Sequence, residues 1–335
     1  MPEPAPVTIA TLSGLLTRGT VTCSTMNVLV TGAAGFLGTR LVEALLSGPD
    51  VPRIVAADTI ACPIADPRVD ARTGTIVDPA FIRDIVDDDV DVVFHLAAVL
   101  SGQSEAEFDL GMRVNVEATR NLLEACRGLG KPPRFVFSST VAVFGGELPD
   151  VVPEDRALQP QSSYGTGKAI AELLVSEYTR RGFIDGVICR LATVTVRPGA
   201  PNSALSSFVS GIIREPLAGI EAVCPVPLDT RLWISSPDVV TANLLHAARV
   251  PATGLDGHLA LNLPGLTVTP AQMLASLERA GGAAARARVR CEIDPRVSRV
   301  VFTWPGTLDD SRARRLGFRA DRNFDDVVRQ YVGER

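Results

Sequence analysis

The sequence predicts an α/β fold, in which a doubly wound parallel sheet carries helices on both faces and is followed by a smaller C-terminal portion. From Met26 onward, short apolar runs typical of buried strands alternate with longer stretches whose apolar residues recur at helical spacing. A glycine-rich turn joins the first strand to the first helix. The composition, 46% apolar and 21% charged over 335 residues, provides enough apolar surface for a large core.

The first elements follow one another closely. Asn27–Thr31 is a short apolar strand that ends in glycine, and Phe36–Leu46 has helical apolar spacing. A second buried strand follows at Ile54–Ala57, and a third clear one at Asp91–Leu96. The long amphipathic stretch Phe108–Cys126 predicts a helix.

The same alternation continues for three more elements. Arg134–Ser138 is an apolar strand, Ala169–Tyr178 continues a helix, and Gly186–Ala192 is again strand-like. Strands joined by helices at this spacing predict a parallel sheet with right-handed crossovers. Helices then cover both faces of the sheet.

The alternation also suggests the domain organisation. We expect residues 1–25 to be a disordered extension, or to reflect an upstream start codon, because they lack the basic region and cleavage site of a signal peptide. Residues 26–193 form the cofactor-binding half, and the helical stretch 233–250 packs back on it. A Pro- and Gly-rich segment after Thr193 ends the regular pattern, so we assign residues 194–232 and 260–335 to a substrate-binding portion.

Charge and cysteine usage exclude several classes of partner. The net charge of −5 argues against nucleic-acid or anionic-membrane binding, because both need a basic face. No apolar run approaches the roughly 20 residues that span a bilayer. The scattered cysteines and the spacing of His246 and His258 predict no metal site. We therefore expect buried free thiols in a cytoplasmic protein.

The glycine turn is the first motif that carries chemistry. Gly32, Gly35 and Gly38 lie between strand and helix, where they allow a tight turn, close approach of pyrophosphate and close helix–strand packing. Asp58 ends the second strand, where a carboxylate accepts hydrogen bonds from ribose hydroxyls and repels a 2′-phosphate. The pattern favours NAD over NADP. The alternative reading of Asp58 is a solvated loop residue.

A second motif pairs a phenol with an ammonium. Tyr164 and Lys168 are four residues apart and share a helix face, so the positive charge is expected to lower the phenol pKa and create a general base. Ser138-Ser139-Thr140 directly follows a strand, at the edge of the sheet that faces the ligand crevice. A hydroxyl there can bind a substrate oxygen. Each motif alone could be structural.

These motifs together resemble the extended short-chain dehydrogenase/reductase family, also called the NAD-dependent epimerase/dehydratase family. The likeness includes His95-Leu-Ala-Ala98, Asn115 in the following helix, and the segment Val141–Gly145. It implies a seven-stranded Rossmann-type sheet, tightly held NAD, and a catalytic set of Thr140, Tyr164 and Lys168.

The resemblance also implies the cofactor and substrate contacts. The residues expected at the cofactor are Gly32, Gly35, Phe36, Leu37, Gly38, Asp58, Ile76, Leu96, Ala97, Ala98, Asn115, Ser138, Tyr164, Lys168 and Thr193. Those expected at the substrate are Ser139, Thr140, Tyr164, Arg197 and Arg214. His95 is expected to be structural, and Trp233 and Trp304 to be packing residues.

Two departures bear on the substrate. Gly74-Thr75-Ile76 stands where many members carry an aspartate that contacts adenine, and Thr193 stands where nucleotide-sugar enzymes carry asparagine. A nucleotide-sugar epimerase or dehydratase is therefore the second hypothesis. A non-catalytic NAD-sensing regulator is a third, disfavoured because Tyr164 and Lys168 are both present.

A narrower likeness concerns three long segments, His95–Asn115, Ser162–Phe183 and Val196–Gly219, which resemble the D-erythronate dehydrogenase subfamily. It implies NAD-dependent oxidation of the C2 hydroxyl of a four-carbon sugar acid. Such a substrate needs a cation, and a guanidinium holds a carboxylate well. Arg197 and Arg214 lie in the distinctive segment, Arg231 and Arg299 are further candidates, and a surface ion pair is the alternative for each.

The two long helices predict assembly. The helix near Phe108–Cys126 and the helix near Ala169–Tyr178 carry apolar residues on more than one face, so they need a second burial partner. The residues concerned are Val114, Val116, Leu122, Leu123, Ile170, Leu173, Leu174 and Val175. In the family this pair forms a two-fold interface, which implies a homodimer.

Overall fold

A seven-stranded sheet in which every neighbouring pair is parallel forms the centre of the computed structural model, which describes residues 26–199, 206–255 and 257–334. The strand order is β10-β6-β5-β4-β1-β2-β3. The strands are β1 (Asn27–Thr31), β2 (Arg53–Asp58), β3 (Val69–Thr73), β4 (Val92–His95), β5 (Arg134–Thr140), β6 (Asp185–Leu191) and β10 (Ala260–Asn262). The predicted doubly wound α/β fold is confirmed, whereas the extension 1–25 lies outside the described residues.

Alternate side chains along each strand enter two separate cores. In β1, Val28 and Val30 face one core and Leu29 the other, as the two-residue period of a strand requires. The first core is covered by α1 (Phe36–Leu46) and α8 (Pro237–Ala247). The second is covered by α2 (Pro79–Ile85), α5 (Ala118–Arg127) and α6 (Ser163–Arg180). The carboxyl ends of the strands remain open to a ligand.

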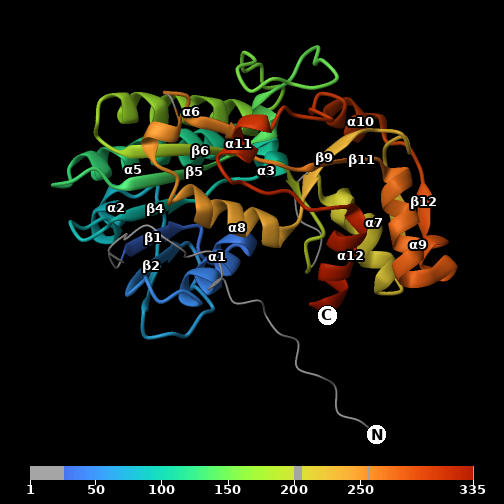
Figure 1. The fold of residues 1–335 in the computed structure, drawn as a ribbon, viewed down its shortest axis with the longest axis horizontal. Helices are drawn as coiled ribbons and strands as arrows, with labels where there is room; N and C mark the ends of the chain where they lie inside the picture. The colour runs from blue at the N-terminus through green and yellow to red at the C-terminus, as the bar shows by residue number, and fades with distance from the viewer. Residues whose placement is uncertain (1–25, 200–205, 256, 335) are drawn as a thin grey trace, which may run out of the picture.

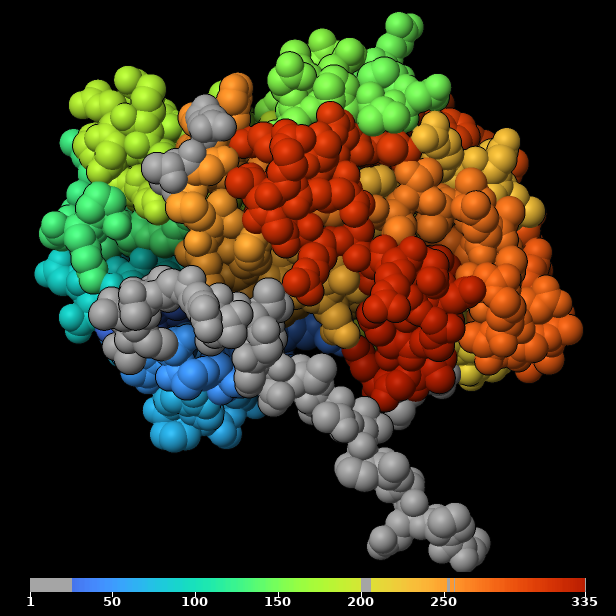
Figure 2. Space-filling view, viewed as in Figure 1, coloured from blue at the N-terminus to red at the C-terminus, as the bar shows by residue number. Residues whose placement is uncertain are grey.

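The C-terminal elements form a second, smaller unit with its own core. They lie at the opposite end of the molecule from α2 and α5 (Figure 1) and make one block in the space-filling view (Figure 2). Its strands are β7 (Thr193–Val194), β8 (Ala222–Cys224), β9 (Leu232–Ser235), β11 (Leu266–Val268) and β12 (Val289–Cys291). Its helices are α7 (Ser207–Leu217), α9 (Pro270–Arg286), α10 (Pro295–Val301) and α12 (Phe324–Gly333). α11 (Ser311–Arg315) and the short turn η4 (Ala252–Leu255), which precedes β10, pack on the first core of the main sheet instead.

The structure differs from the sequence prediction at two strands and one helix. β3 was not predicted because two of the five residues in its sequence, VDART, are charged and break the apolar pattern of a buried strand. The prediction that a helix begins at residue 233 was wrong, because Trp233 lies in β9. Ser236 is the N-cap of α8, and Pro237 is its first residue. β10, placed by sequence in the C-terminal portion, is an edge strand of the main sheet.

The long helix predicted over Phe108–Cys126 is interrupted. It is preceded by α3 (Ser101–Ala106) and consists of α4 (Phe108–Met112), a π-helical turn η2 (Arg113–Glu117) and α5. A π-helical turn inserts a residue and changes which carbonyl groups are free to accept other hydrogen bonds, and such turns are frequent at functional sites. Asn115 is the central residue of η2.

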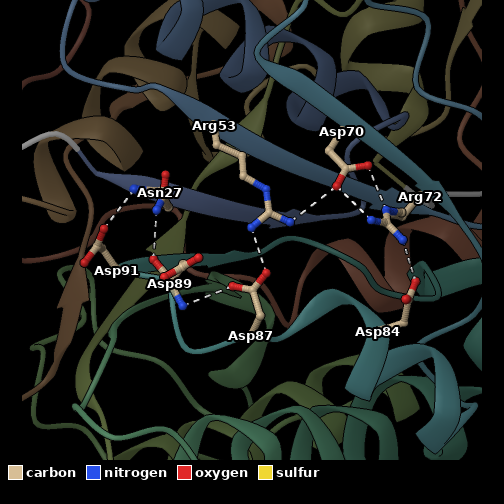
Figure 3. A network of polar contacts seen from close by, with 8 residues as sticks. All are labelled: Asn27, Arg53, Asp70, Arg72, Asp84, Asp87, Asp89 and Asp91. Atoms are coloured by element: carbon tan, nitrogen blue, oxygen red, sulfur yellow. Dashed lines mark hydrogen bonds and ion pairs between the residues drawn. The ribbon is translucent and has the colours of Figure 1, made fainter.

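An ionic network ties the amino ends of the strands together (Figure 3). Arg53 at the start of β2 donates to Asp87 at 2.7 Å and to Asp70 at 3.3 Å, and Arg72 donates to Asp70 and Asp84. Asn27 is held by Asp91. Because Asn27 and Arg53 begin their strands and Asp91 directly precedes β4, opposite the glycine turn, we interpret the network as structural.

Within the described residues, none of the helices combines the length and apolar character needed to cross a membrane. The same residues contain no group of three or more His, Cys, Asp or Glu side chains placed to hold a metal ion.

Candidate active site

The glycine turn after β1 forms a close-packed cradle. Gly32 has a φ of 75°, and a Cβ there would lie 2.7 Å from the Ala97 nitrogen. A Cβ on Gly38 would lie 2.0 Å from the Gly32 oxygen, so α1 packs directly on the turn. α1 begins at Gly35 without a side-chain cap. Its first backbone N–H groups can therefore bind an anion, and the cradle fits the pyrophosphate of NAD.

Asp58 lies beside this cradle at the carboxyl end of β2. One carboxylate oxygen accepts a hydrogen bond from the Ala34 nitrogen at 3.0 Å, and the other accepts from the Thr59 nitrogen at 2.6 Å. The carboxylate is therefore fixed next to the glycine turn and is half-buried. This position fits contact with the adenosine ribose and disfavours a 2′-phosphate.

His95 is the centre of a buried hydrogen-bond chain behind the cradle. Its Nδ1 lies 2.7 Å from the Thr31 hydroxyl, and its Nε2 lies 2.9 Å from the Thr119 hydroxyl. Because Thr119 donates its own proton to the Asn115 carbonyl, Nε2 must be the protonated ring nitrogen, and Nδ1 accepts from Thr31. Burial, with the nearby Lys168, lowers the pKa of His95 to about 3. The imidazole is thus neutral and structural, as the sequence predicted.

Asn115 holds the loop that follows β4. Its side-chain oxygen accepts from the Val99 nitrogen at 2.8 Å, and its nitrogen donates to the Val99 carbonyl at 3.1 Å. Both polar ends are thereby used on the protein's own backbone. Asn115 therefore fixes the segment that follows Leu96, Ala97 and Ala98, and its direct contact with the cofactor stays a prediction.

The other predicted cofactor residues fall near the same edge of the sheet. Phe36 and Leu37 open α1 and are partly exposed, Thr193 begins β7, and Ile76 is largely buried just beyond β3. Ser138 is buried, and its hydroxyl donates to the His95 carbonyl at 2.9 Å. Direct cofactor contacts by these residues stay predictions.

Thr140, Tyr164 and Lys168 are brought together by one strand–helix contact. Lys168 Nζ donates to the Ser138 carbonyl at 2.8 Å and lies 5.9 Å from the centre of the Tyr164 ring. Thr140 caps the short helix η3 (Val141–Val143) that follows β5. A Cβ on Gly165 would stand 2.2 Å from the Ala142 oxygen, so the start of α6 presses against this turn.

The electrostatics of this set differ from the sequence prediction. We expected Lys168 to lower the phenol pKa, but burial raises the pKa of Tyr164 to about 12. The rise is caused by burial of the phenol itself. Lys168, only 2% exposed, is also disfavoured as a cation: burial lowers its pKa to about 7, opposed by the charge of Glu172. Both groups are therefore held towards their neutral forms.

Two residues predicted at the substrate, Ser139 and Arg214, are buried and bonded to other residues, and their contact with a substrate stays a prediction. Ser139 is 2% exposed, and its hydroxyl donates to Glu172 at 2.5 Å. Because side chains alternate along β5, Ser139 lies on the opposite face of the strand from Thr140. Arg214 is buried, donates to the Arg197 carbonyl at 2.8 Å, and is paired with Glu215 at 2.6 Å.

Arg197 is different from Arg214. Among the described residues it has no carboxylate within ion-pair distance, although it is half-buried. Burial and the neighbouring Arg214 guanidinium lower its pKa. An uncompensated, partly buried cation of this kind is suited to an anionic ligand.

Sequence reasoning missed Glu172 and Arg190. Their side chains are 4% and 6% exposed and form an ion pair at 2.8 Å. The available signal was the i, i+4 spacing of Lys168 and Glu172, which places an acid one turn from the predicted catalytic lysine. The partner on β6 could not be read from spacing.

The fold and the site define a dinucleotide-dependent enzyme of the Rossmann type. The chain belongs to the NAD dependent epimerase/dehydratase family, whose model matches residues 28–260. Its cofactor is NAD.

Particular relatives narrow this further. The chain is 50% identical over 317 residues to a D-erythronate dehydrogenase of Cupriavidus necator, covering 92% of this chain and 98% of the relative. It is 44% identical to one from Haemophilus influenzae, covering 92% and 99%. Among solved structures, a nucleoside-diphosphate-sugar epimerase from Agrobacterium tumefaciens is similar with a TM-score of 0.88 and 37% identity, covering 96% and 98%.

The position of Asp58 predicts the cofactor preference. Wild-type kcat/KM should be at least about tenfold higher with NAD than with NADP, or about 1.4 kcal/mol, because the carboxylate repels a 2′-phosphate. Asp58→Asn keeps an oxygen that can accept the hydrogen bond from the Ala34 nitrogen. It should reduce the ratio of the two kcat/KM values, mainly by raising kcat/KM with NADP. Steady-state rates with both cofactors measure it. Equal kcat/KM values in the wild type would contradict this role.

The burial of Lys168 predicts a pH-dependent stability. With a pKa of about 7 in the folded chain against about 10.5 unfolded, the unfolded state binds more protons between these values. The free energy of unfolding of the wild type, relative to Lys168→Met, should therefore rise with pH through this window, by at most about 1.4 kcal/mol per unit. Urea unfolding of both proteins at several pH values measures it. Parallel pH profiles would show that Lys168 is not perturbed by burial.

Proposed function

We propose that the chain oxidises the C2 hydroxyl of D-erythronate to 2-oxo-D-erythronate. The observation that carries this proposal is the 50% identity to a D-erythronate dehydrogenase over nearly the whole of both chains. The arrangement of Thr140, Tyr164 and Lys168 around the end of β5 supports it, because these are the groups that an alcohol oxidation requires.

The chain's own residues move the proton. NAD, when bound, supplies the hydride acceptor and a cationic nicotinamide ring. Tyr164 accepts the proton of the C2 hydroxyl as the C2–H bond breaks and the C2–O double bond forms. Thr140 orients the reacting oxygen, and Lys168 supports the negative charge on the phenol oxygen. Because burial raises the pKa of Tyr164 to about 12, this support is needed for the base to act near neutral pH.

Arg197 is the residue that we assign to the substrate carboxylate. Of the two predicted arginines, Arg197 has no carboxylate partner among the described residues, whereas Arg214 forms an ion pair with Glu215. Arg214 also holds the Arg197 carbonyl and so positions it. Recognition of a charged end by a guanidinium fits a small sugar acid.

A nucleotide-sugar epimerase or dehydratase is the second candidate, and the name of the Agrobacterium tumefaciens neighbour favours it. That neighbour is 37% identical, below the 50% and 44% of the two dehydrogenases. Thr193 also lacks the amide expected of nucleotide-sugar enzymes. The two candidates are distinguished by whether NADH accumulates, because an epimerase returns its hydride to the substrate.

The surface of α4 and α6 supports a homodimer. Leu173 is 68% exposed and Phe108 58% exposed, and both are large apolar side chains. The predicted interface residues Leu122, Leu123 and Val175 are instead fully buried in the second core. Fewer of the predicted residues are therefore exposed and able to contact a second copy than the sequence indicated. Apolar side chains so exposed favour burial against a second copy.

A cytoplasmic location completes the proposal. The cysteines of the described residues are free, namely Cys62, Cys126, Cys189, Cys224 and Cys291. Free thiols favour a reducing compartment such as the cytoplasm.

The function is tested by following NADH absorbance with D-erythronate and with nucleotide sugars. The wild type should reduce NAD with D-erythronate. Tyr164→Phe should lower kcat by roughly 10²–10⁴-fold while retaining NAD binding, because it removes the base and keeps the ring. Thr140→Val should cost less. More than a tenth of wild-type turnover in Tyr164→Phe would contradict the mechanism, and NADH formation only with a nucleotide sugar would contradict the substrate.

Arg197→Met should raise the KM for D-erythronate by roughly 10–100-fold, since it removes a charged hydrogen-bond donor. The KM for NAD should stay within about twofold. Arg231→Met is the matched control, because Arg231 is exposed and already paired with Asp150. An unchanged KM for D-erythronate in Arg197→Met would show that another group binds the carboxylate.

The dimer is tested by light scattering coupled to size exclusion. The wild type should have about twice the 35.5 kDa of one chain at micromolar concentration. Leu173→Glu should shift the mass towards the monomer, because it buries a charge at the interface. Ile220→Glu, at an apolar position that is also exposed but lies beyond α7, is the control. A wild-type mass of one chain would overturn the dimer.

A further inference from the structure

Glu172 lies one helical turn beyond Lys168 and is as deeply buried. The two residues are 3% and 2% exposed overall, and both side chains bond β5 from α6. Lys168 donates to the carbonyl of Ser138, and Glu172 accepts from the hydroxyl of Ser139. Two successive residues of β5 thus hold two successive turns of the catalytic helix, and Thr140 follows directly.

Arg190 holds the Glu172 carboxylate from the neighbouring strand. Ser139 and Arg190 are register partners in β5 and β6. The guanidinium donates to both carboxylate oxygens, at 2.8 Å to 3.2 Å, and to the Glu154 carbonyl at 2.8 Å. A charge so completely removed from water is retained only with paired, hydrogen-bonded partners. The proposed reaction uses neither Glu172 nor Arg190.

The charged and titratable groups around Lys168 are few. Tyr164 and Glu172 face it from α6, and His95 faces it from β4. His95 is neutral, as its hydrogen bonds show, and Arg190 stands behind Glu172. Of these groups, Glu172 is the one whose negative charge favours the ammonium form of Lys168.

We propose that Glu172, held by Arg190 and Ser139, is a positioning residue that fixes α6 on β5 and sustains the positive charge of Lys168. This inference rests on the proposed function for its catalytic consequence. Glu172 touches no reacting atom and acts through Lys168. The buried ion pair is therefore retained for its effect on the lysine as well as for the packing of the helix.

The test compares Glu172→Gln with the wild type by urea unfolding across pH. Loss of the carboxylate should lower the Lys168 pKa further, so the rise of stability with pH should begin below about pH 7, roughly one unit earlier. Asp185→Asn is the matched control, because it breaks an ion pair with buried Arg134 at the other end of the same two strands. Asp185→Asn should lower the free energy of unfolding by the same amount at every pH. If Glu172→Gln also lowers the free energy of unfolding by the same amount at every pH, the proposal is overturned.

Activity gives the second readout. Glu172→Gln should lower kcat with D-erythronate at least about tenfold, while the KM for NAD stays within about twofold of wild type. Glu172→Asp keeps the negative charge, so its kcat should lie between those of Glu172→Gln and the wild type. If Glu172→Gln does not fold, Ser139→Ala is used instead. This variant keeps the charges of Glu172 and Arg190 and removes only the hydrogen bond from Ser139 to Glu172. Its kcat should fall about threefold or more, and wild-type kcat would overturn the proposal. A wild type inactive on D-erythronate contradicts the proposed function instead, and the unfolding profiles still decide the role of Glu172.

Discussion

The hydrogen bond from Lys168 Nζ to the Ser138 carbonyl is the contact on which the site depends. It joins α6, which carries Tyr164 and Lys168, to the carboxyl end of β5, which carries Thr140 two residues later. The two elements can approach because Gly165 faces the Ala142 oxygen, where no Cβ would fit. The relative positions of three reacting groups therefore follow from one strand–helix contact, and such orientation supplies much of an enzyme's rate enhancement.

The same burial that fixes these groups also sets their chemistry. Removal from water favours the neutral forms of both Tyr164 and Lys168, so a phenolate–ammonium pair must be sustained by groups around it. Glu172 lies on the far side of the lysine and is neutralised in turn by Arg190. His95, by contrast, is kept neutral and links the glycine turn to the π-helical turn at Asn115. Behind the reacting groups, the buried charges are thus those of the Glu172–Arg190 pair, while His95 is neutral.

Much of this arrangement was predictable from the sequence because it depends on local pattern. The continuous apolar strands, the glycine turn and the Tyr164/Lys168 spacing each carry their signal within a few residues. β3 could not be found because an edge strand with VDART lacks an apolar run. Ser139 directly precedes Thr140, but its side chain bonds Glu172, because one step along a strand reverses the face of the sheet. The pairing of Arg190 with Glu172 depends on a contact between β6 and α6 that spacing does not reveal. Arg214 and Glu215 are neighbours in the sequence, but adjacency alone does not predict their ion pair.

The central claim is that this site removes a hydride from C2 of a four-carbon sugar acid. The most direct measurement supplies D-erythronate carrying deuterium at C2, with NAD, and locates the label by mass spectrometry. The account predicts that the deuterium is found in the reduced nicotinamide and that the product is the 2-oxo acid. Deuterium retained in the sugar acid while NADH forms would show oxidation at another carbon and would contradict the account.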